Sequence, residues 1–299
     1  MRTHLGSKLL WMALGLFMFL AGPVHTQESK KIRVVLIDGQ NNHNWRATTP
    51  VMKKALLDCG RFTVDVSTNL KPGDKAPEGW QAVPFPPDLS KYDVVVSNYN
   101  GAMWPKDFNA SLEESLKNGK IALVIVHAAN NSFGGWQEYV KMVGMGWYGK
   151  TTGDRLYLDD AGKKVTVAKG EGDGPGHRYT GEFKVLVRDS SHPVTKGMPL
   201  EWLHARDELY DNMRGPIQNI HLLATAFSKG TKVHEPMIWT ISYGKGRVFH
   251  TPMGHDANAM TCVGFITTLQ RGTEWAATGT VTMPIPSNFP TGDKTSTVK

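Results

Sequence analysis

The sequence predicts an α/β protein with a doubly wound parallel sheet in its first half and an antiparallel β extension in its second half. Residues 32–37 and 121–126 are almost continuously apolar, which indicates strands buried on both faces, and residues 92–97 give a further strand. Segments of helical length separate these strands, and this order implies right-handed β-α-β crossovers. Beyond residue 149 the apolar segments become short and are separated by turns, as in antiparallel sheets.

The first strand and helix follow standard boundary signals. A polar loop at residues 38–46 follows the strand at residues 32–37 and leads into a helix. Pro50 is expected in the first turn of this helix and Gly60 at its end, because proline fits early positions and glycine fits late ones. Residues 62–66 then alternate as a second strand. This order is flavodoxin-like.

The third strand, at residues 92–97, comes after a proline-rich connection at residues 72–87. Ser111 and Glu114 have the spacing of a capping box, which predicts the start of a helix that ends at Gly119. The fourth strand follows directly.

The second half predicts short strands, one hairpin and one long helix. Gly244-Lys245-Gly246 supplies the turn of the hairpin. Prolines and polar residues after the helix predict a disordered tail. The expected ranges are strands at 155–158, 164–167, 183–187, 221–226, 237–243 and 247–251, the helix at 260–277 and the tail at 281–299.

The beginning of the chain has the pattern of a secretory signal peptide. Arg2 and Lys8 precede an apolar run at residues 9–20, which is shorter than a membrane-spanning helix requires. We therefore expect a signal peptide at residues 1–26, export to the periplasm or the extracellular space, and no membrane attachment after cleavage. An uncleaved anchor is the weaker alternative. One α/β domain is expected at residues 27–280.

Charge and cysteine content narrow the class of protein. The formal net charge is +7, and the basic residues are scattered singly, so no nucleic-acid partner is expected. The sequence contains two cysteines, Cys59 and Cys262, both in predicted helices. One disulfide between them, or two buried thiols, would fit. The sequence does not specify the oligomeric state.

Two loops that follow predicted parallel strands are rich in amide and aromatic side chains. Asn41, His43 and Trp45 follow the first strand, and Asn98 and Trp104 follow the third. Ligands bind beyond the carboxyl ends of strands in such sheets, and amides with an aromatic ring suit ligands rich in hydroxyl groups. The structural alternative is an asparagine-rich turn that caps the next helix.

His127 directly follows the fourth strand, where α/β enzymes often place a nucleophile. Neither serine nor cysteine occupies this turn, and Ser132 comes too late, so acyl-enzyme chemistry has no evident nucleophile. His127 is a candidate general acid or base or metal ligand, and Asn130 a candidate ligand-binding residue. The alternative is that His127 only bonds a neighbouring loop.

Two further clusters lie in the second half. Asp207 and Glu208 offer carboxylates that could position or deprotonate a substrate hydroxyl, although such charges usually lie on a solvated surface. His255 and Asp256 place an imidazole beside a carboxylate after the last hairpin strand. His127, Glu208 and His255 would make a His-His-carboxylate metal set, so a divalent metal would be compatible with the sequence, but none is required.

Four ordered motifs resemble the ThuA-like family across residues 32–277. The motifs are the run His-Ala-Ala-Asn-Asn-Ser-Phe at 127–133, residues 192–199, residues 207–210 and residues 239–256. The resemblance implies the class I glutamine amidotransferase-like fold and a role in trehalose use or wider sugar catabolism. Ala128 and Ala129 stand where the family usually has glycines. The amidotransferase cysteine is missing, so glutamine hydrolysis is not expected.

The sequence therefore predicts an exported enzyme that acts on a small sugar or glycoside by acid–base chemistry. His127, Glu208 and His255 are the expected catalytic residues, and hydrolysis, isomerisation or elimination would fit. A non-catalytic carbohydrate-binding module and a metal-dependent hydrolase are the alternatives. The expected substrate-binding residues are Asn41, His43, Trp45, Asn98, Trp104, Asn130, Tyr210 and Asp256.

Overall fold

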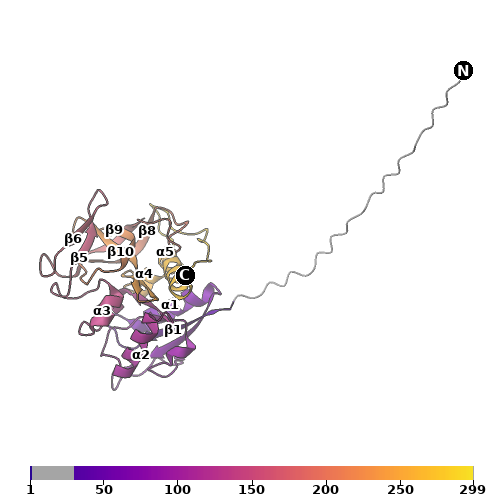
Figure 1. The fold of residues 1–299 in the computed structure, drawn as a ribbon, viewed down its shortest axis with the longest axis vertical. Coiled ribbons are helices and arrows are strands. Elements are labelled where there is room, and N and C mark those ends of the chain that lie inside the picture. The colour runs from indigo at the N-terminus through magenta and orange to yellow at the C-terminus, as the bar shows by residue number, and fades with distance from the viewer. Residues whose placement is uncertain (2–29, 299) are drawn as a thin grey trace. The chain divides into compact units, whose positions relative to one another are not determined.

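The computed structural model describes Met1 and residues 30–298, and the chain divides into two units at residues 30 and 31. Residues 31–298 carry the fold that is drawn in colour in Figure 1. Apart from Met1, the predicted signal peptide lies outside the described residues. Within the described part of the chain, no helix combines the length and the apolar character needed to cross a membrane.

One 11-stranded sheet organises the folded unit, in the order β2-β1-β3-β4-β11-β10-β9-β7-β8, with β5 and β6 attached beside β10. Its parallel part, from β2 to β11, is flanked by antiparallel strands from β10 to β8. The parallel strands are β1 (Ile32–Asp38), β2 (Phe62–Thr68), β3 (Val94–Ser97), β4 (Ala122–Val126) and β11 (Gly246–Thr251). The others are β5 (Arg155–Leu158), β6 (Lys164–Val167), β7 (Gly176–Val187), β8 (Glu201–Asp211), β9 (Ile220–Phe227) and β10 (His234–Tyr243). This arrangement confirms the predicted fold class.

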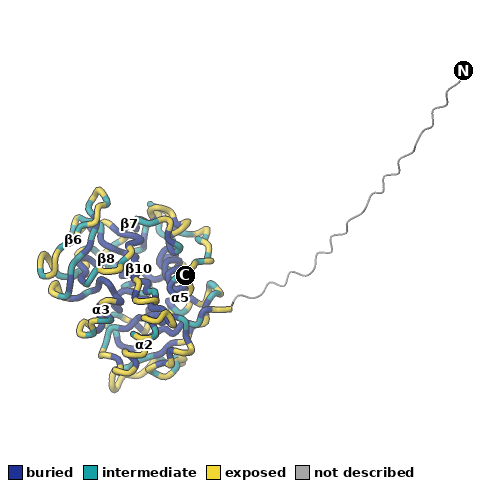
Figure 2. Tube along the Cα trace, viewed as in Figure 1, coloured by how far each residue is buried: buried dark blue, intermediate teal, exposed yellow. Residues whose placement is uncertain are grey.

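Helices cover both faces of the sheet and enclose two apolar cores. Side chains of α2 (Lys106–Lys117) and α3 (Gln137–Val143) contribute to one core. Side chains of α1 (Trp45–Asp58) and α5 (Val263–Thr278) contribute to the other. Figure 2 shows the buried segments in dark blue through the middle of this unit. Each fully buried aliphatic or aromatic side chain stabilises the fold by about 1.5–3 kcal/mol. The remaining helices are α4 (Ala257–Met260), η1 (Leu89–Lys91) and η2 (His127–Asn131).

Three local predictions are wrong. Helix α2 begins at Lys106 after Pro105, so Ser111 lies inside the helix and does not cap it. Helix α1 begins at Trp45, after Asn44, whose side chain accepts the Ala47 N–H group. Pro50 therefore lies beyond the first turn. Strand β8 was missed altogether. Its charged residues resemble those of a solvated loop more than those of a buried strand.

The C-terminal segment is the largest correction to the predicted organisation. Residues 281–298 are not a disordered tail, because they pack along the folded unit. The Leu203 N–H group donates to the Thr291 carbonyl at 2.7 Å, and the Phe289 ring lies 5.6 Å from the Trp202 ring. The Val298 N–H group donates to Thr261 at 2.9 Å. Prolines remove backbone donors but do not prevent an extended segment from packing.

Asp38, the last residue of β1, gives a pH-dependent prediction. Its side chain is fully buried, and burial raises its pKa from 3.8 to about 6, partly opposed by the hydroxyl groups of Thr68 and Thr49. Between these two values the folded chain binds more protons than the unfolded chain, so the free energy of unfolding falls as pH rises and stays lower above pH 6.

The side chain introduced by Asp38→Asn cannot ionise. The stability of this variant relative to the wild type should therefore increase as pH rises. The difference in unfolding free energy is expected to move by about 2–3 kcal/mol in favour of the variant between pH 4 and pH 8. Urea denaturation at both pH values measures this difference. An equal effect of the substitution at both values would contradict the prediction.

Candidate functional site

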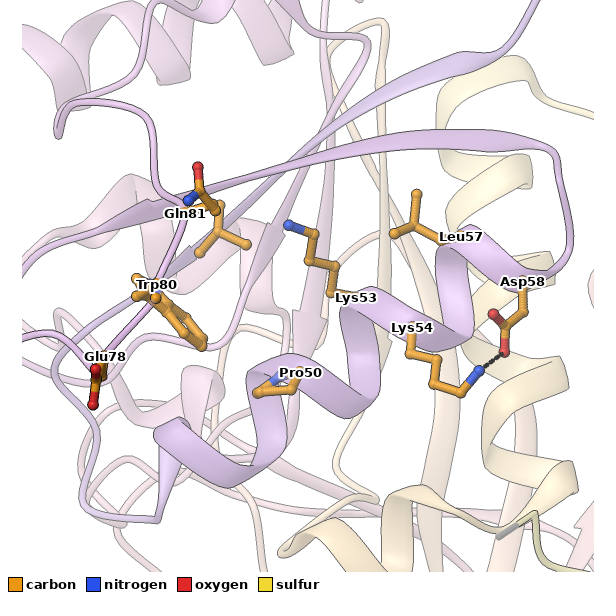
Figure 3. A pocket seen from close by; sticks show the side chains of 10 residues that line it. Pro50, Lys53, Lys54, Leu57, Asp58, Glu78, Trp80 and Gln81 are labelled. Carbon is orange, nitrogen blue, oxygen red and sulfur yellow. Dashed lines mark hydrogen bonds and ion pairs between the residues drawn. The ribbon is translucent and has the colours of Figure 1, made fainter.

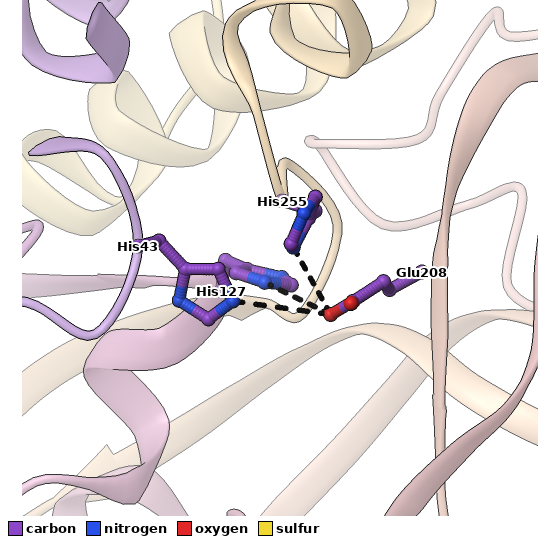
Figure 4. Close-up of side chains that lie close together, drawn as sticks. All are labelled: His43, His127, Glu208 and His255. Atoms are coloured by element: carbon purple, nitrogen blue, oxygen red, sulfur yellow. Dashed lines mark ion pairs between the residues drawn. The ribbon is translucent and has the colours of Figure 1, made fainter.

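Three histidines and one glutamate converge at one edge of the sheet (Figure 4). His43, His127 and His255 lie in the segments that follow β1, β4 and β11, and Glu208 lies within β8. Their ligand-type atoms all lie within 4.8 Å of one another. Because β1, β4 and β11 run parallel, their carboxyl ends meet at the same edge, where α/β sheets bind ligands. We call these four residues the His/Glu cluster.

Glu208 is the centre of the His/Glu cluster. Its Oε2 atom lies 3.1 Å from His255 Nδ1, 3.8 Å from His127 Nε2 and 3.9 Å from His43 Nε2. The exposed side-chain fraction is 3% for His127, 13% for Glu208 and 34% for His255. Solvent, and therefore a substrate, reaches the cluster from the side of His255.

Asp207 joins the strand that carries Glu208 to the segment that carries His255. Its buried carboxylate accepts hydrogen bonds from the backbone N–H groups of Gly254 at 2.6 Å and His255 at 3.0 Å. It also accepts the N–H group of Glu208 at 2.8 Å and faces His204 Nε2 at 2.8 Å. Four contacts on one carboxylate therefore fix two members of the cluster relative to each other.

His204 and Asp207 form a buried ion pair. Burial alone would lower the pKa of His204, but its contacts with Asp207 and the Cys262 thiol raise that pKa to about 9. Burial opposes ionisation of Asp207, but the contacts with His204 and the Gly254 N–H group, together with other nearby groups, lower the pKa of its carboxyl group overall. Cys262 and Cys59 are both free thiols, so the disulfide considered from the sequence is not formed.

Outer hydrogen bonds fix which nitrogen of two rings carries the proton. His127 Nδ1 lies 2.7 Å from the Pro252 carbonyl, which only accepts, so Nδ1 carries the hydrogen and Nε2 the lone pair. The Tyr210 hydroxyl donates to this Nε2 atom at 2.9 Å. His43 Nδ1 lies 3.3 Å from Asn41 Oδ1, which orients that ring in the same way. Both Nε2 lone pairs therefore point into the cluster.

Burial keeps these two imidazoles uncharged. It lowers the pKa of His127 to about 3 and, together with the nearby His255, the pKa of His43 to about 4. At neutral pH both rings offer a lone pair rather than an acidic proton. They are suited to accept hydrogen bonds from hydroxyl groups or to bind a metal ion.

The backbone at His127 is strained. Its φ angle is +46°, in the left-handed region that non-glycine residues rarely occupy. Such a conformation costs about 1–3 kcal/mol and persists where surrounding structure enforces it, often at functional sites. Here the turn from β4 into η2 aims the imidazole at Glu208. The sequence indicated a sharp turn at this point, although Ala128 and Ala129 follow it instead of glycines.

The structure places three other predicted residues beside the cluster. Tyr210 contacts His127, and Asn41 orients His43, so both act on cluster residues directly. Asp256 has a different role, because its side chain accepts the Ala259 N–H group at 2.8 Å and caps α4.

The two predicted tryptophans are not in the site. Trp104 is 2% exposed and packs against Phe108 and Phe133 in an apolar core. Trp45 is 3% exposed and packs against Trp80. The structure does not bring them to the cluster, and burial leaves little of either ring accessible. A tryptophan after a strand can equally close the core beneath the loop.

Two predicted asparagines are also internal. Asn98 is buried and donates to the hydroxyl groups of Thr48 and Thr49 at 3.0 Å. Asn130 is fully buried, and its amide faces His250 and the backbone N–H group of Trp147. The structure does not place either side chain among the residues of the cluster. They hold loops in place through buried hydrogen bonds.

His177 and Trp147 were missed from the sequence. His177 Nε2 lies 3.5 Å from Glu208 Oε1, and its side chain is 45% exposed. The Trp147 ring lies 4.6 Å from Tyr210 and 5.8 Å from His177. Both residues follow glycine in segments without a clear strand or helix pattern, so no sequence signal marked them. They extend the site beyond the His/Glu cluster, next to Glu208 and Tyr210.

A separate pocket of about 380 Å³ lies between α1 and residues 78–81 (Figure 3). It is lined by Lys53, Leu57 and Trp80, and its Lys54–Asp58 pair is an exposed contact along one helix. None of its lining residues belongs to the His/Glu cluster. Because convergent titratable groups define a reacting centre better than pocket size does, the cluster is the candidate site.

The fold and the site define an α/β protein with an imidazole–carboxylate centre at the carboxyl edge of a parallel sheet. The chain belongs to the ThuA family, described as trehalose utilisation, whose model matches residues 33–276. This confirms the resemblance to the ThuA-like family seen in the sequence.

Two solved structures are similar to the chain. A putative ThuA-like protein from Parabacteroides merdae ATCC 43184 shares 41% identity, with a TM-score of 0.82, and the match covers 90% of this chain and 98% of that one. Another from Bacteroides uniformis ATCC 8492 shares 16% identity, with a TM-score of 0.53 and coverage of 87% and 98%, and supports the fold alone. A comparison with curated proteins finds no match.

Proposed function

We propose that this chain is an exported enzyme of carbohydrate catabolism that acts on a small sugar or glycoside at the His/Glu cluster. One observation carries the proposal, namely that His43, His127, His255 and Glu208 meet at the edge of the sheet where this fold class binds ligands. The family description, trehalose utilisation, supports a carbohydrate substrate. The basic start of the chain and its apolar run support export through residues 1–26.

The proposed chemistry is proton transfer to and from substrate hydroxyl groups. Glu208 is the group that accepts a proton, because its carboxylate lies at the centre of the cluster. His255 is more exposed than the other cluster residues and is the acid–base partner on the substrate side. The neutral rings of His43 and His127 accept hydrogen bonds from hydroxyl groups and orient the sugar. Hydrolysis, isomerisation and elimination all use these steps.

Glutamine hydrolysis is not part of the proposal. An amidotransferase needs a cysteine thiolate at the turn that follows β4, and His127 stands there. Cys262 is buried beside His204, and Cys59 ends helix α1. Neither thiol belongs to the cluster.

A turnover screen tests the proposal. The chain from residue 27 onward is incubated with disaccharides and oxidised glycosides, and products are detected by mass. We expect product from at least one sugar, and a fall of at least about 10²-fold in His127→Asn. Asparagine tolerates a positive φ angle, so this variant keeps the turn while losing the imidazole.

His221→Asn is the matched control, because His221 is exposed and pairs with Asp189 rather than with the cluster. Its turnover should equal that of the wild type. If no sugar is turned over although sugars still bind, the chain is a carbohydrate-binding module and the proposal is wrong.

A further inference from the structure

We propose that the His/Glu cluster binds one divalent transition-metal ion of the Zn²⁺ class through His43 Nε2, His127 Nε2, His255 Nδ1 and Glu208 Oε2. The inference rests on the proposed function in taking this cluster as the reacting centre, and it adds the group that would polarise the substrate. Three independent structural observations support it: the donor set, its orientation and one unpartnered nitrogen.

The donor set suits a transition metal. Three imidazole nitrogens and one carboxylate oxygen are ligands that Zn²⁺ and related ions prefer, whereas Ca²⁺ and Mg²⁺ favour oxygen alone. Ligands about 2.0–2.1 Å from a tetrahedral ion lie about 3.3 Å from one another. Glu208 Oε2 is 3.1, 3.8 and 3.9 Å from the three nitrogens, so a small closure of the side chains would complete the site.

The rings are oriented from outside the cluster, as in metal sites. A metal-binding histidine usually donates its other N–H group to a carbonyl or carboxylate, which fixes the ring and its tautomer. His127 does so with the Pro252 carbonyl at 2.7 Å, and His43 faces Asn41 Oδ1 at 3.3 Å. Both nitrogens that point inward then carry lone pairs. An acid–base pair alone would not require both rings to be fixed in this way.

The third observation is an unpartnered nitrogen. His255 Nδ1 is a buried atom that makes no hydrogen bond of acceptable geometry, although it lies 3.1 Å from Glu208 Oε2. Buried polar atoms without a partner are rare, because each loses its hydration without compensation. A metal ion at the centre of the cluster would provide the missing partner for this nitrogen.

The Tyr210 hydroxyl group competes with a metal ion for His127 Nε2, and this competition provides a further test. Its hydroxyl group donates to His127 Nε2 at 2.9 Å, so an ion must displace this hydrogen bond. Tyr210→Phe removes the competing donor and keeps the ring that packs against His127 and Trp147. This variant is therefore expected to bind the ion at least as tightly as the wild type.

Once bound, such an ion would act as a Lewis acid toward a hydroxyl or carbonyl oxygen of the sugar. Glu208 Oε1 lies 3.5 Å from His177 Nε2, whereas Oε2 makes the contacts with the three cluster imidazoles. This oxygen stays free to accept a proton while Oε2 binds the ion. The proposed acid–base role of Glu208 and its role as a ligand are therefore compatible. With the ion bound, the three histidines would serve as ligands in place of the acid–base and hydroxyl-binding roles proposed for the metal-free site.

Metal titration tests the inference. The full chain is stripped with a chelator and titrated with Zn²⁺ by calorimetry and with Co²⁺ by visible absorption, which reports ligand geometry. We expect one ion per chain, with affinity at least tenfold weaker in His43→Asn and in Glu208→Gln. His221→Asn should bind as the wild type does, because His221 is exposed, pairs with Asp189 and lies outside the donor set. Circular dichroism confirms that each variant is folded.

The outcomes separate this inference from the proposed function. Failure to retain Zn²⁺, or equal affinity in all the cluster variants, would overturn the metal site. Weaker binding by Tyr210→Phe would overturn the proposed donor set, because it would make the hydroxyl group a ligand. Sugar turnover that survives stripping would refute a catalytic role of the ion while leaving the proposed enzyme. One bound ion without turnover on any sugar would support the metal site and count against the proposed function.

Discussion

Glu208→Gln is expected to lower sugar turnover by about 10²–10⁴-fold, the usual contribution of a positioned acid or base. Glutamine has the same shape and keeps an oxygen near the three imidazoles, but it has no negative charge and cannot accept a proton. The side chain is 13% exposed and lies at the substrate side of the sheet edge, so the fold should not depend on its charge. Single-turnover kinetics at saturating sugar measures the effect on the chemical step.

Glu182→Gln is the matched control for this substitution. Glu182 is an exposed carboxylate on β7, and the same chemical change there should leave turnover unaltered. If Glu208→Gln retained more than about a tenth of the wild-type rate, Glu208 would not be the proton acceptor. His255 would then be the next candidate.

Asp207→Asn is expected to destabilise the protein by about 3–5 kcal/mol, the usual cost of removing one partner from a buried ion pair. The side chain of His204 is 0% exposed. Without Asp207 it would either remain charged with no ion-pair partner or have to lose its proton. The new amide keeps one oxygen, so its NH2 group would face either the Gly254 N–H group and His204 or the N–H groups of His255 and Glu208. Urea denaturation measures the loss of stability.

A second effect of Asp207→Asn separates positioning from stability. Because Asp207 binds both Glu208 and the His255 segment, kcat should fall at least tenfold even at temperatures where the variant is fully folded. Glu235→Gln is the control, since Glu235 is buried and pairs with Arg155 away from the cluster. That variant should lose stability but keep its kcat. Equal kcat in both variants would show that Asp207 has only a structural role.

The parallel half of the fold could be predicted because its physical signal is local. Strands buried on both faces are almost continuously apolar, and β1, β3 and β4 consist mainly of aliphatic residues. Strand β8 lacks that signal, because its Asp207 and Glu208 serve the site and not the core. The C-terminal segment was misjudged for a related reason. Its packing depends on residues such as Trp202 and Thr261, which are distant in sequence.

The candidate site could be predicted in position but only partly in detail. His127 and His255 were identified because parallel strands place their following residues at one edge, whatever the loops do afterward. Glu208 was identified by residue type, and only the structure shows that it joins them. Trp104 and Asn98 lie outside the cluster because the direction of a loop side chain is set by the core beneath it. His177 was missed because β7 meets Glu208 through long-range pairing with β8.

The donors of the His/Glu cluster come from residue 43 near the start of the fold and residue 255 near its end. They form a set only when the parallel and antiparallel parts of the sheet are both in place, and the unfolded chain offers no such set. A ligand that contacts all four residues therefore adds its binding free energy to the unfolding of the whole domain, about 4 kcal/mol at a thousandfold excess over Kd. The melting temperature of the unlabelled protein consequently reports on ligand occupancy, and sugars or ions can be ranked before the reaction itself is known.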